Sequence, residues 1–440
     1  MKNVFAAILL SIFLALPRST QAQRFLMDMI DTTNQMGKGM LSIYERYNKV
    51  KLSGYIQPQF QIASAKGAEI YAGPNFSEFA NNRFMLRRGR LRVDYAHMNH
   101  KGQPSSYFVF QFDGTERGVA IRDFWGRFYE NKFKLFSLTT GMFARPFGYE
   151  VNLSSSRRES PERGRMSQIL MKSERDLGAM LSMSSRTITN RLSYLKLDIG
   201  VFNGQGLAGT MDYDSHKDVI GRLSLKPTSL LSCQELILTA GISGYLGGIT
   251  NRSPVLYQAQ RINGGYQMQA DSSQQNVQST APRRYFGADV QLKVNPKPFT
   301  TELRAEFIGG LQTATASTSQ SPGSYPTVNG QLDPLYIRSF NGAYFCLIQN
   351  LGGEDNQLIL KYDYYDPNTK STGQQVTEDL GFTAADVRYD TFGFGYLHRA
   401  NSTLKFIFYY DIIKNEKTSL EGFTTDLPDN VFTCRVQYNF

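Results

Sequence analysis

Three arginines at alternate positions, Arg88, Arg90 and Arg92, are the residues of this 440-residue chain whose spacing best suits chemistry with anions. In an extended strand they share one face with Asp94, while Leu91 and the other intervening residues point the opposite way. A guanidinium group presents a planar fork of donors that matches the oxygens of a carboxylate or a phosphate. Such a strand suits either a soluble sheet with a charged surface or a membrane barrel whose arginines face a water-filled lumen.

Residues that would carry catalysis or bind a metal are sparse. The four histidines have no metal-ligand spacing to cysteines or carboxylates, and the three cysteines are far apart and odd in number. The formal net charge is +10, but the positive charge is spread along the chain and interrupted by acids, with no recognised nucleic-acid-binding module. We therefore expect no enzyme, no cofactor or metal, and no nucleic-acid partner.

The first residues have the pattern of a secretory signal peptide. A basic start is followed by an apolar run from Val4 to Leu16 and a small-residue exit that ends at Ala22. The apolar run is shorter than the ~20 residues that a membrane-spanning helix needs. We expect a cleaved signal peptide over 1–22, a periplasmic N-terminal extension over 23–50, and a β-domain over 51–440.

From residue 51 onward, alternating apolar and polar residues predict sixteen strands, most of them close to the length that crosses a bilayer at a tilt. The predicted ranges are 51–63, 83–96, 104–113, 118–130, 133–143, 175–185, 191–203, 216–226, 233–247, 284–294, 299–309, 337–349, 356–366, 387–398, 402–411 and 430–440.

The connections between these strands alternate in length. Those after even-numbered strands are short, and those after odd-numbered strands are long and polar, with the link 114–117 as the exception. An up-and-down barrel produces this alternation, with tight periplasmic turns and long outer loops. An even number of strands also places both termini in the periplasm.

The last predicted strand supports the same fold. Phe432, Val436 and Phe440 fall on its apolar face, and Arg435 falls on its polar face. The chain stops on Phe440, which resembles the terminal signal by which the barrel-assembly machinery recognises bacterial outer-membrane proteins. We therefore predict an all-β protein of the bacterial outer membrane: a transmembrane antiparallel up-and-down barrel of about 16 strands, surrounded by lipid.

Several short motifs resemble the phosphate-selective porins O and P, and they occur in the family's order over roughly residues 51–225. They are Phe84 to Val93, Arg122-Asp123-Phe124-Trp125, Gly141 to Glu150, Arg175 to Ala179, Val201 to Gly206, and Lys217 to Leu223. The resemblance implies a usually trimeric anion channel for phosphate or polyphosphate, whose third extracellular loop, here residues 144–174, folds into the pore.

With that resemblance, the candidate pore-lining residues are arginines of the strands and of the third loop. They are Arg88, Arg90, Arg92, Arg127, Arg145, Arg157, Arg158, Arg163 and Arg165. Several weak sites in series let an ion enter a pore and still leave it. Two other functions stay open: a general, non-selective porin, and a barrel that acts as a structural anchor or assembly partner with a closed pore.

Overall fold

The computed structural model describes residues 50–187, 192–208, 212–230, 236–295 and 299–440. The fold described below is carried by the unit formed by residues 52–440. The predicted signal peptide (1–22) and nearly all of the predicted extension (23–50) lie outside the described residues.

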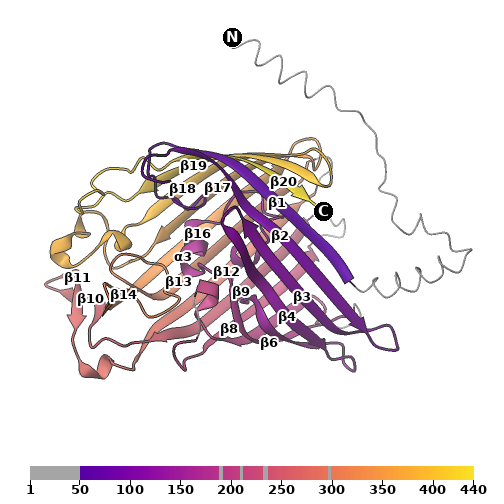
Figure 1. Ribbon diagram of the computed structural model, residues 1–440, viewed down its shortest axis with the longest axis horizontal. Coiled ribbons are helices and arrows are strands. Elements are labelled where there is room, and N and C mark those ends of the chain that lie inside the picture. Colours follow the sequence, from indigo (N-terminus) through magenta and orange to yellow (C-terminus); the bar gives the residue numbers. More distant parts are fainter. Residues whose placement is uncertain (1–49, 188–191, 209–211, 231–235, 296–298) are drawn as a thin grey trace, which may run out of the picture. The chain divides into compact units, whose positions relative to one another are not determined.

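Sixteen strands of the described chain form a closed antiparallel barrel, as the sequence predicts (Figure 1). The first eight are β1 (Val50–Ala63), β2 (Asn82–Met98), β3 (Pro104–Thr115), β4 (Gly118–Tyr129), β5 (Phe136–Ala144), β6 (Arg175–Ser184), β7 (Leu195–Phe202) and β8 (Asp218–Ser229). The second eight are β9 (Leu236–Thr250), β12 (Thr280–Val294), β13 (Thr301–Ala314), β16 (Leu335–Asn350), β17 (Asn356–Asp366), β18 (Tyr389–Arg399), β19 (Leu404–Asn415) and β20 (Val431–Asn439). Antiparallel pairing of β1 with β20, from Tyr55–Asn439 to Ala63–Val431, closes the sheet.

The remaining elements belong to the connections. A hairpin of β10 (Leu256–Ile262) and β11 (Gly265–Asp271) joins the sheet through a short parallel pairing of β10 with β16, and β14 (Thr327–Val328) pairs with β15 (Gln331–Leu332). The helical elements are α3 (Arg165–Leu170), η2 (Glu150–Asn152), η3 (Gly206–Ala208), η4 (Gln274–Asn276), η5 (Gly373–Gln375), η6 (Glu378–Leu380) and η7 (Ala384–Asp386). No helix within the described ranges is long and apolar enough to cross a membrane.

Each predicted strand corresponds to an observed one, and the differences are at the ends. β5 begins at Phe136 rather than at residue 133, because Lys134 adopts a left-handed conformation with φ of 54°. The Glu130 carboxylate stabilises this turn by accepting hydrogen bonds from the backbone N–H groups of Phe133 (2.6 Å) and Leu135 (3.4 Å). The sequence predicts no strand between 247 and 284 or between 309 and 337, but the first of these connections contains the β10–β11 hairpin and the second contains β14 and β15.

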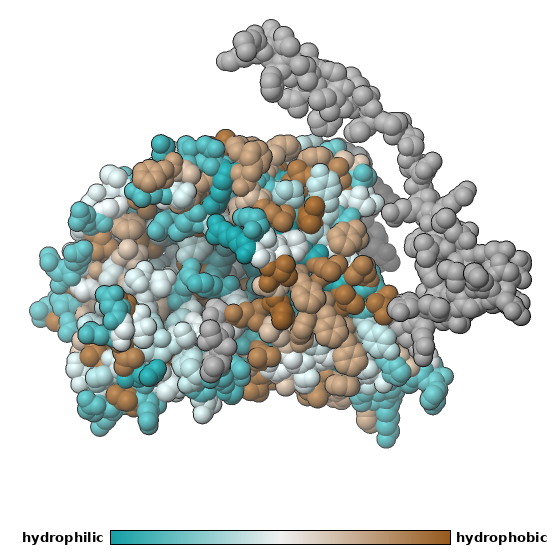
Figure 2. Space-filling model, viewed as in Figure 1, coloured by the Kyte–Doolittle hydropathy of each residue, from teal (hydrophilic) through white to brown (hydrophobic). Residues whose placement is uncertain are grey.

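The two faces of the barrel wall differ in polarity. Along β13, Leu303 and Phe307 are exposed on the outside, whereas Arg304 and Glu306 are buried on the inside. Figure 2 shows hydrophobic atoms gathered over the strands and hydrophilic atoms toward the turns and loops. Charge on a lipid-facing position costs a few kcal/mol at mid-bilayer, which explains why charged side chains such as those of Arg304 and Glu306 face the lumen.

The third loop, residues 145–174, folds into the barrel as predicted. Its apolar side chains form one buried cluster with aromatic and aliphatic residues of the inner wall. The loop contributes Phe147, Val151, Met166, Ile169, Leu170 and Met171, and the wall contributes Phe143, Met180, Phe202, Ile220, Tyr245, Tyr285, Ile308, Phe340 and Tyr365. This cluster fixes one flank of the loop and leaves the other flank to face the arginine-bearing strands.

Candidate functional site

Carboxylates of the wall hold the beginning of the third loop through its backbone. Glu306 on β13 accepts hydrogen bonds from the N–H groups of Tyr149 (2.8 Å) and Glu150 (2.9 Å). Asp363 on β17 accepts one from the N–H of Arg165 at 3.1 Å. These bonds pin the chain on both sides of residues 150–164, because they engage main-chain groups that cannot change rotamer.

A glycine makes the first of these contacts possible. Gly148 has a φ of +66°, in the left-handed region that favours glycine, and a Cβ added there would collide with the Glu306 carboxylate. A residue with a Cβ at this position would therefore disturb the contact between the loop and Glu306.

Ion pairs complete the anchoring of this flank. Arg304 on β13 contacts both carboxylate oxygens of Glu159, at 2.7 and 3.1 Å. Lys361 on β17 contacts Glu150, and Lys405 on β19 donates to the carbonyl of Ser156 at 2.8 Å. Cations and anions are close to balanced here, so this flank is suited to holding the loop.

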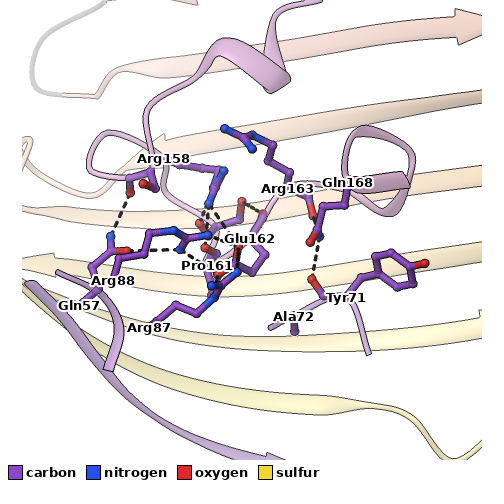
Figure 3. A network of polar contacts seen from close by, with 12 residues as sticks. Gln57, Tyr71, Ala72, Arg87, Arg88, Arg158, Pro161, Glu162, Arg163 and Gln168 are labelled. Carbon is purple, nitrogen blue, oxygen red and sulfur yellow. Dashed lines mark hydrogen bonds and ion pairs between the residues drawn. The ribbon is translucent and has the colours of Figure 1, made fainter. Parts of the chain in front are cut away.

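The opposite flank of the loop presents Glu162 to a group of arginines (Figure 3). Arg87 and Arg88 of β2 contact its carboxylate at 2.9 and 2.6 Å, and Arg435 of β20 contacts it at 2.8 Å. Arg158 of the loop lies 3.6 Å away. One carboxylate thus forms ion pairs with four guanidinium groups.

A second acidic residue of the loop, Glu174, stands in a similar position. It pairs with Arg122 of β4, with Arg163 of the loop at 3.1 Å, and with Arg175 of β6 at 2.7 Å. Two wall carboxylates extend the group: Asp113 contacts Arg90 at 3.0 Å and Arg122 at 3.6 Å, and Asp123 contacts Arg175 at 3.1 Å. Together the Glu162 and Glu174 groups bring eight arginines to four carboxylates within the described residues.

A cavity of about 1110 Å³ lies against these groups. Nine basic and five acidic side chains line it, a net charge of +4. The basic ones are Lys66, Arg87, Arg88, Arg90, Arg122, Arg158, Arg163, Arg165 and Lys172, and the acidic ones are Glu69, Asp113, Glu162, Glu174 and Asp429. The lining of the cavity beside the loop is therefore positive.

The surplus of arginines shifts the pKa values of Glu162 and Arg158. Burial opposes ionisation of Glu162, but Arg87, Arg88 and Arg435 overcome it and hold the pKa of that carboxyl well below its ordinary value. Burial, reinforced by Arg88 and opposed by Glu162, lowers the pKa of Arg158 to about 10. Both groups are therefore charged at neutral pH.

Two guanidinium nitrogens at the cavity have no hydrogen-bond partner among the described residues. They are Nη1 of Arg158 and Nε of Arg122, and both are buried. A buried donor without a partner costs about 1–3 kcal/mol.

Five of the nine sequence-predicted arginines line the cavity: Arg88, Arg90, Arg158, Arg163 and Arg165. The guanidinium group of Arg165 lies between the rings of Tyr71 and Tyr389, at 4.4 and 3.5 Å from their centroids. This arrangement positions the arginine at the cavity wall.

The other four predicted arginines lie away from the cavity. Arg92 pairs with Asp94 at 2.7 Å, and Arg127 donates to Thr139 at 2.8 Å. Arg145 is buried and lies 3.4 Å from the hydroxyl of Tyr245, and Arg157 is exposed on the loop. The structure therefore does not gather the whole predicted set in one place.

Sequence reasoning missed Arg87, Arg122, Arg175 and Arg435 as site residues. A signal existed for three of them, since Arg122 and Arg175 begin the motifs that resemble the porin family and Arg435 falls on the polar face of the last strand. Arg87 had none, because strict alternation places it on the face opposite Arg88.

The structure shows why alternation fails at this point. Met85 lies within hydrogen-bonding distance of the inward-facing Gln59 (3.3 Å), and both Arg87 and Arg88 reach Glu162. Odd-numbered residues therefore face inward before this pair, and even-numbered residues face inward after it. A break of one residue in the alternation, as in a β-bulge, brings two adjacent arginines to one carboxylate.

Comparisons with known proteins agree on the fold. No family model and no curated protein sequence matches the chain. Among solved structures, OprB of Pseudomonas putida is similar with a TM-score of 0.58 and 9% identity, over 93% of this chain and 98% of that one. The outer membrane channel DcaP of Acinetobacter baumannii is similar with a TM-score of 0.51 and 12% identity, over 89% of this chain and 97% of that one. The chain thus has the fold of outer-membrane channels.

Proposed function

We propose that this protein is a porin of the bacterial outer membrane that lets small anions diffuse passively, in preference to cations. The observation that carries this proposal is the cavity beside the third loop, whose lining has a net charge of +4. In the Glu162 and Glu174 groups, the arginines are twice as numerous as the carboxylates. The arginines therefore do more than neutralise the carboxylates of the lumen.

The physical basis is replacement of hydration. A small anion that enters a narrow passage loses water, and guanidinium groups replace that water with charge-assisted hydrogen bonds. The arginines around Glu162 and those around Glu174 would act as two weak sites along one cavity. Phosphate and polyphosphate are the solutes that we propose from the resemblance to porins O and P.

Assembly completes the proposal. We infer export by a cleaved signal peptide, insertion through the barrel-assembly machinery with Phe440 as its signal, and a homotrimer. The support is the sequence pattern at the two ends and the family resemblance. The size of the protein in mild detergent tests the trimer.

Planar-bilayer recording in a KCl gradient tests the anion preference. The wild-type reversal potential should have the sign of an anion-preferring channel. The triple change Arg88→Gln, Arg90→Gln and Arg163→Gln should reduce the anion-to-cation permeability ratio several-fold, because all three side chains line the cavity. Arg117 lies in the exposed turn between β3 and β4, beside Glu116 and outside the cavity lining. The matched control Arg92→Gln, Arg117→Gln and Arg127→Gln removes the same charge away from the cavity and should change the ratio little.

Two results would overturn the proposal in favour of its alternatives. Conductance without anion preference would indicate a general, non-selective porin. Absence of conductance would indicate a structural anchor or assembly partner with a closed pore.

A further inference from the structure

The arginine group formed by Arg87, Arg88, Arg158 and Arg435 already has an anionic occupant, the side chain of Glu162. Its Oε1 accepts from Nε of Arg87 (2.9 Å), Nη1 of Arg88 (3.0 Å) and Nη2 of Arg435 (2.8 Å). Its Oε2 accepts from Nη2 of Arg88 at 2.6 Å and from Nη2 of Arg87 at 3.3 Å. Both oxygens are thus satisfied as they would be in a bound free carboxylate.

The loop does not depend on this contact for its position. Its opposite flank is held by the wall carboxylates Glu306 and Asp363 and by the pair of Glu159 with Arg304. Near Glu162 itself, the carbonyl of Pro161 accepts from Arg435 at 2.5 Å and from Arg158 at 3.1 Å. The Glu162 side chain can therefore leave the arginines by a rotamer change while the loop backbone stays in place.

We propose that these four arginines form an oxyanion-binding site, and that Glu162 occupies it as a tethered competitor until a solute displaces it. This inference rests on the proposed anion channel and names a residue that sets its affinity. Arg87, Arg88, Arg158 and Glu162 all line the cavity, so a solute in the passage reaches the site directly.

Charge balance explains why a competitor is useful. Four guanidinium groups without a carboxylate would hold an oxyanion tightly, and an ion held tightly does not leave the pore. A carboxylate on the same loop is present at a high effective concentration, so it lowers the apparent affinity of every external anion. The solute then exchanges with Glu162, and the arginines are never left without a partner.

The geometry also selects the class of anion. The donors of Arg88 form a fork across two oxygens of one group, with Nη1 to Oε1 and Nη2 to Oε2. A carboxylate or a phosphate reproduces this two-oxygen contact, and a halide does not. Chloride should therefore compete only weakly with Glu162, and oxyanions should compete well.

The test is block of KCl current by inorganic phosphate in wild-type and Glu162→Gln channels. The neutral amide cannot neutralise four arginines, so the half-blocking phosphate concentration should fall by on the order of tenfold. Glu159→Gln is the matched control. It removes the same charge from the same loop, but its partner is Arg304 on the anchoring flank, and the half-blocking concentration should stay near the wild-type value.

Two outcomes overturn the inference. An unchanged or higher half-blocking concentration in Glu162→Gln means that Glu162 positions the arginines and does not compete for them. Glu162→Asp, which keeps the charge but shortens its reach by one methylene, should tighten phosphate block to a smaller degree, and failure to do so counts equally against the inference. The wild-type reversal potential reports on the proposed function separately, so the two can fail independently.

Discussion

The two flanks of the third loop carry similar charged residues in different proportions. On the flank toward β13 and β17, apolar side chains pack against the wall and the cations do not outnumber the carboxylates. On the flank toward β2 and β4, a cavity remains and arginines outnumber carboxylates.

Glu159 and Glu162, three residues apart, make the contrast explicit. Glu159 meets Arg304, which also contacts Glu302 at 2.6 Å, so acids outnumber the cation there. Glu162 meets four arginines. Under the proposed function, the local ratio of charges, and not the presence of an ion pair, would separate an anchor from an anion-binding site.

The largest effect should come from breaking the anchoring flank at Gly148. In Gly148→Ala, the new Cβ meets the Glu306 carboxylate, so this carboxylate must give up its bonds to the loop or the loop must move away from β13. We expect a single-channel conductance several-fold higher than that of the wild type, because a displaced loop widens the lumen. Single-channel recording in a planar bilayer measures this.

The control for this change is Gly102→Ala in the turn between β2 and β3. Gly102 has a similar φ of +68°, but an added Cβ meets nothing within 4 Å. Its backbone penalty of about 1 kcal/mol should leave the conductance unaltered. Equal conductance in the two variants would show that Gly148 does not fix the loop.

Replacement of one arginine by glutamine should have a smaller effect, and this effect should differ between the two flanks. Arg304→Gln leaves Glu159 without a cation in a buried position and should lower the free energy of unfolding by on the order of 3 kcal/mol, measured by urea titration in detergent. Arg88→Gln leaves three arginines on Glu162, so its cost in stability should be smaller. The reversal potential should shift in Arg88→Gln and not in Arg304→Gln, and the opposite pattern would refute the division into an anchor and a binding site.

The sequence predicts the wall of this molecule far better than its lumen. Contact with lipid requires apolar residues at alternate positions of each strand, and this period of two reveals the strand positions. Residues such as Leu303 and Phe307 therefore identify the outward face without any tertiary information. Five arginines of the cavity were also predicted. The pairing of Arg435 with Glu162 was not, because residues 273 positions apart meet only when the barrel closes and the loop folds in. Arg87 was missed because the break in alternation beside Arg88 cannot be read from a strict period of two.

The smallest effect should come from pH, through Asp429 at the edge of the cavity. Burial raises the pKa of Asp429 to about 6, although Arg165 opposes the shift. Above this pH the carboxylate is charged and reduces the positive charge of the cavity, and below it the group is neutral. Anion preference should therefore rise modestly between about pH 7.5 and pH 5.5, a window in which ordinary carboxyls stay ionised. Glu162, whose pKa lies well below its usual value, should not contribute.

Reversal potentials at the two pH values measure the change, and Asp429→Asn should give the low-pH value at both. Persistence of the full pH dependence in this variant would assign the titration to another group.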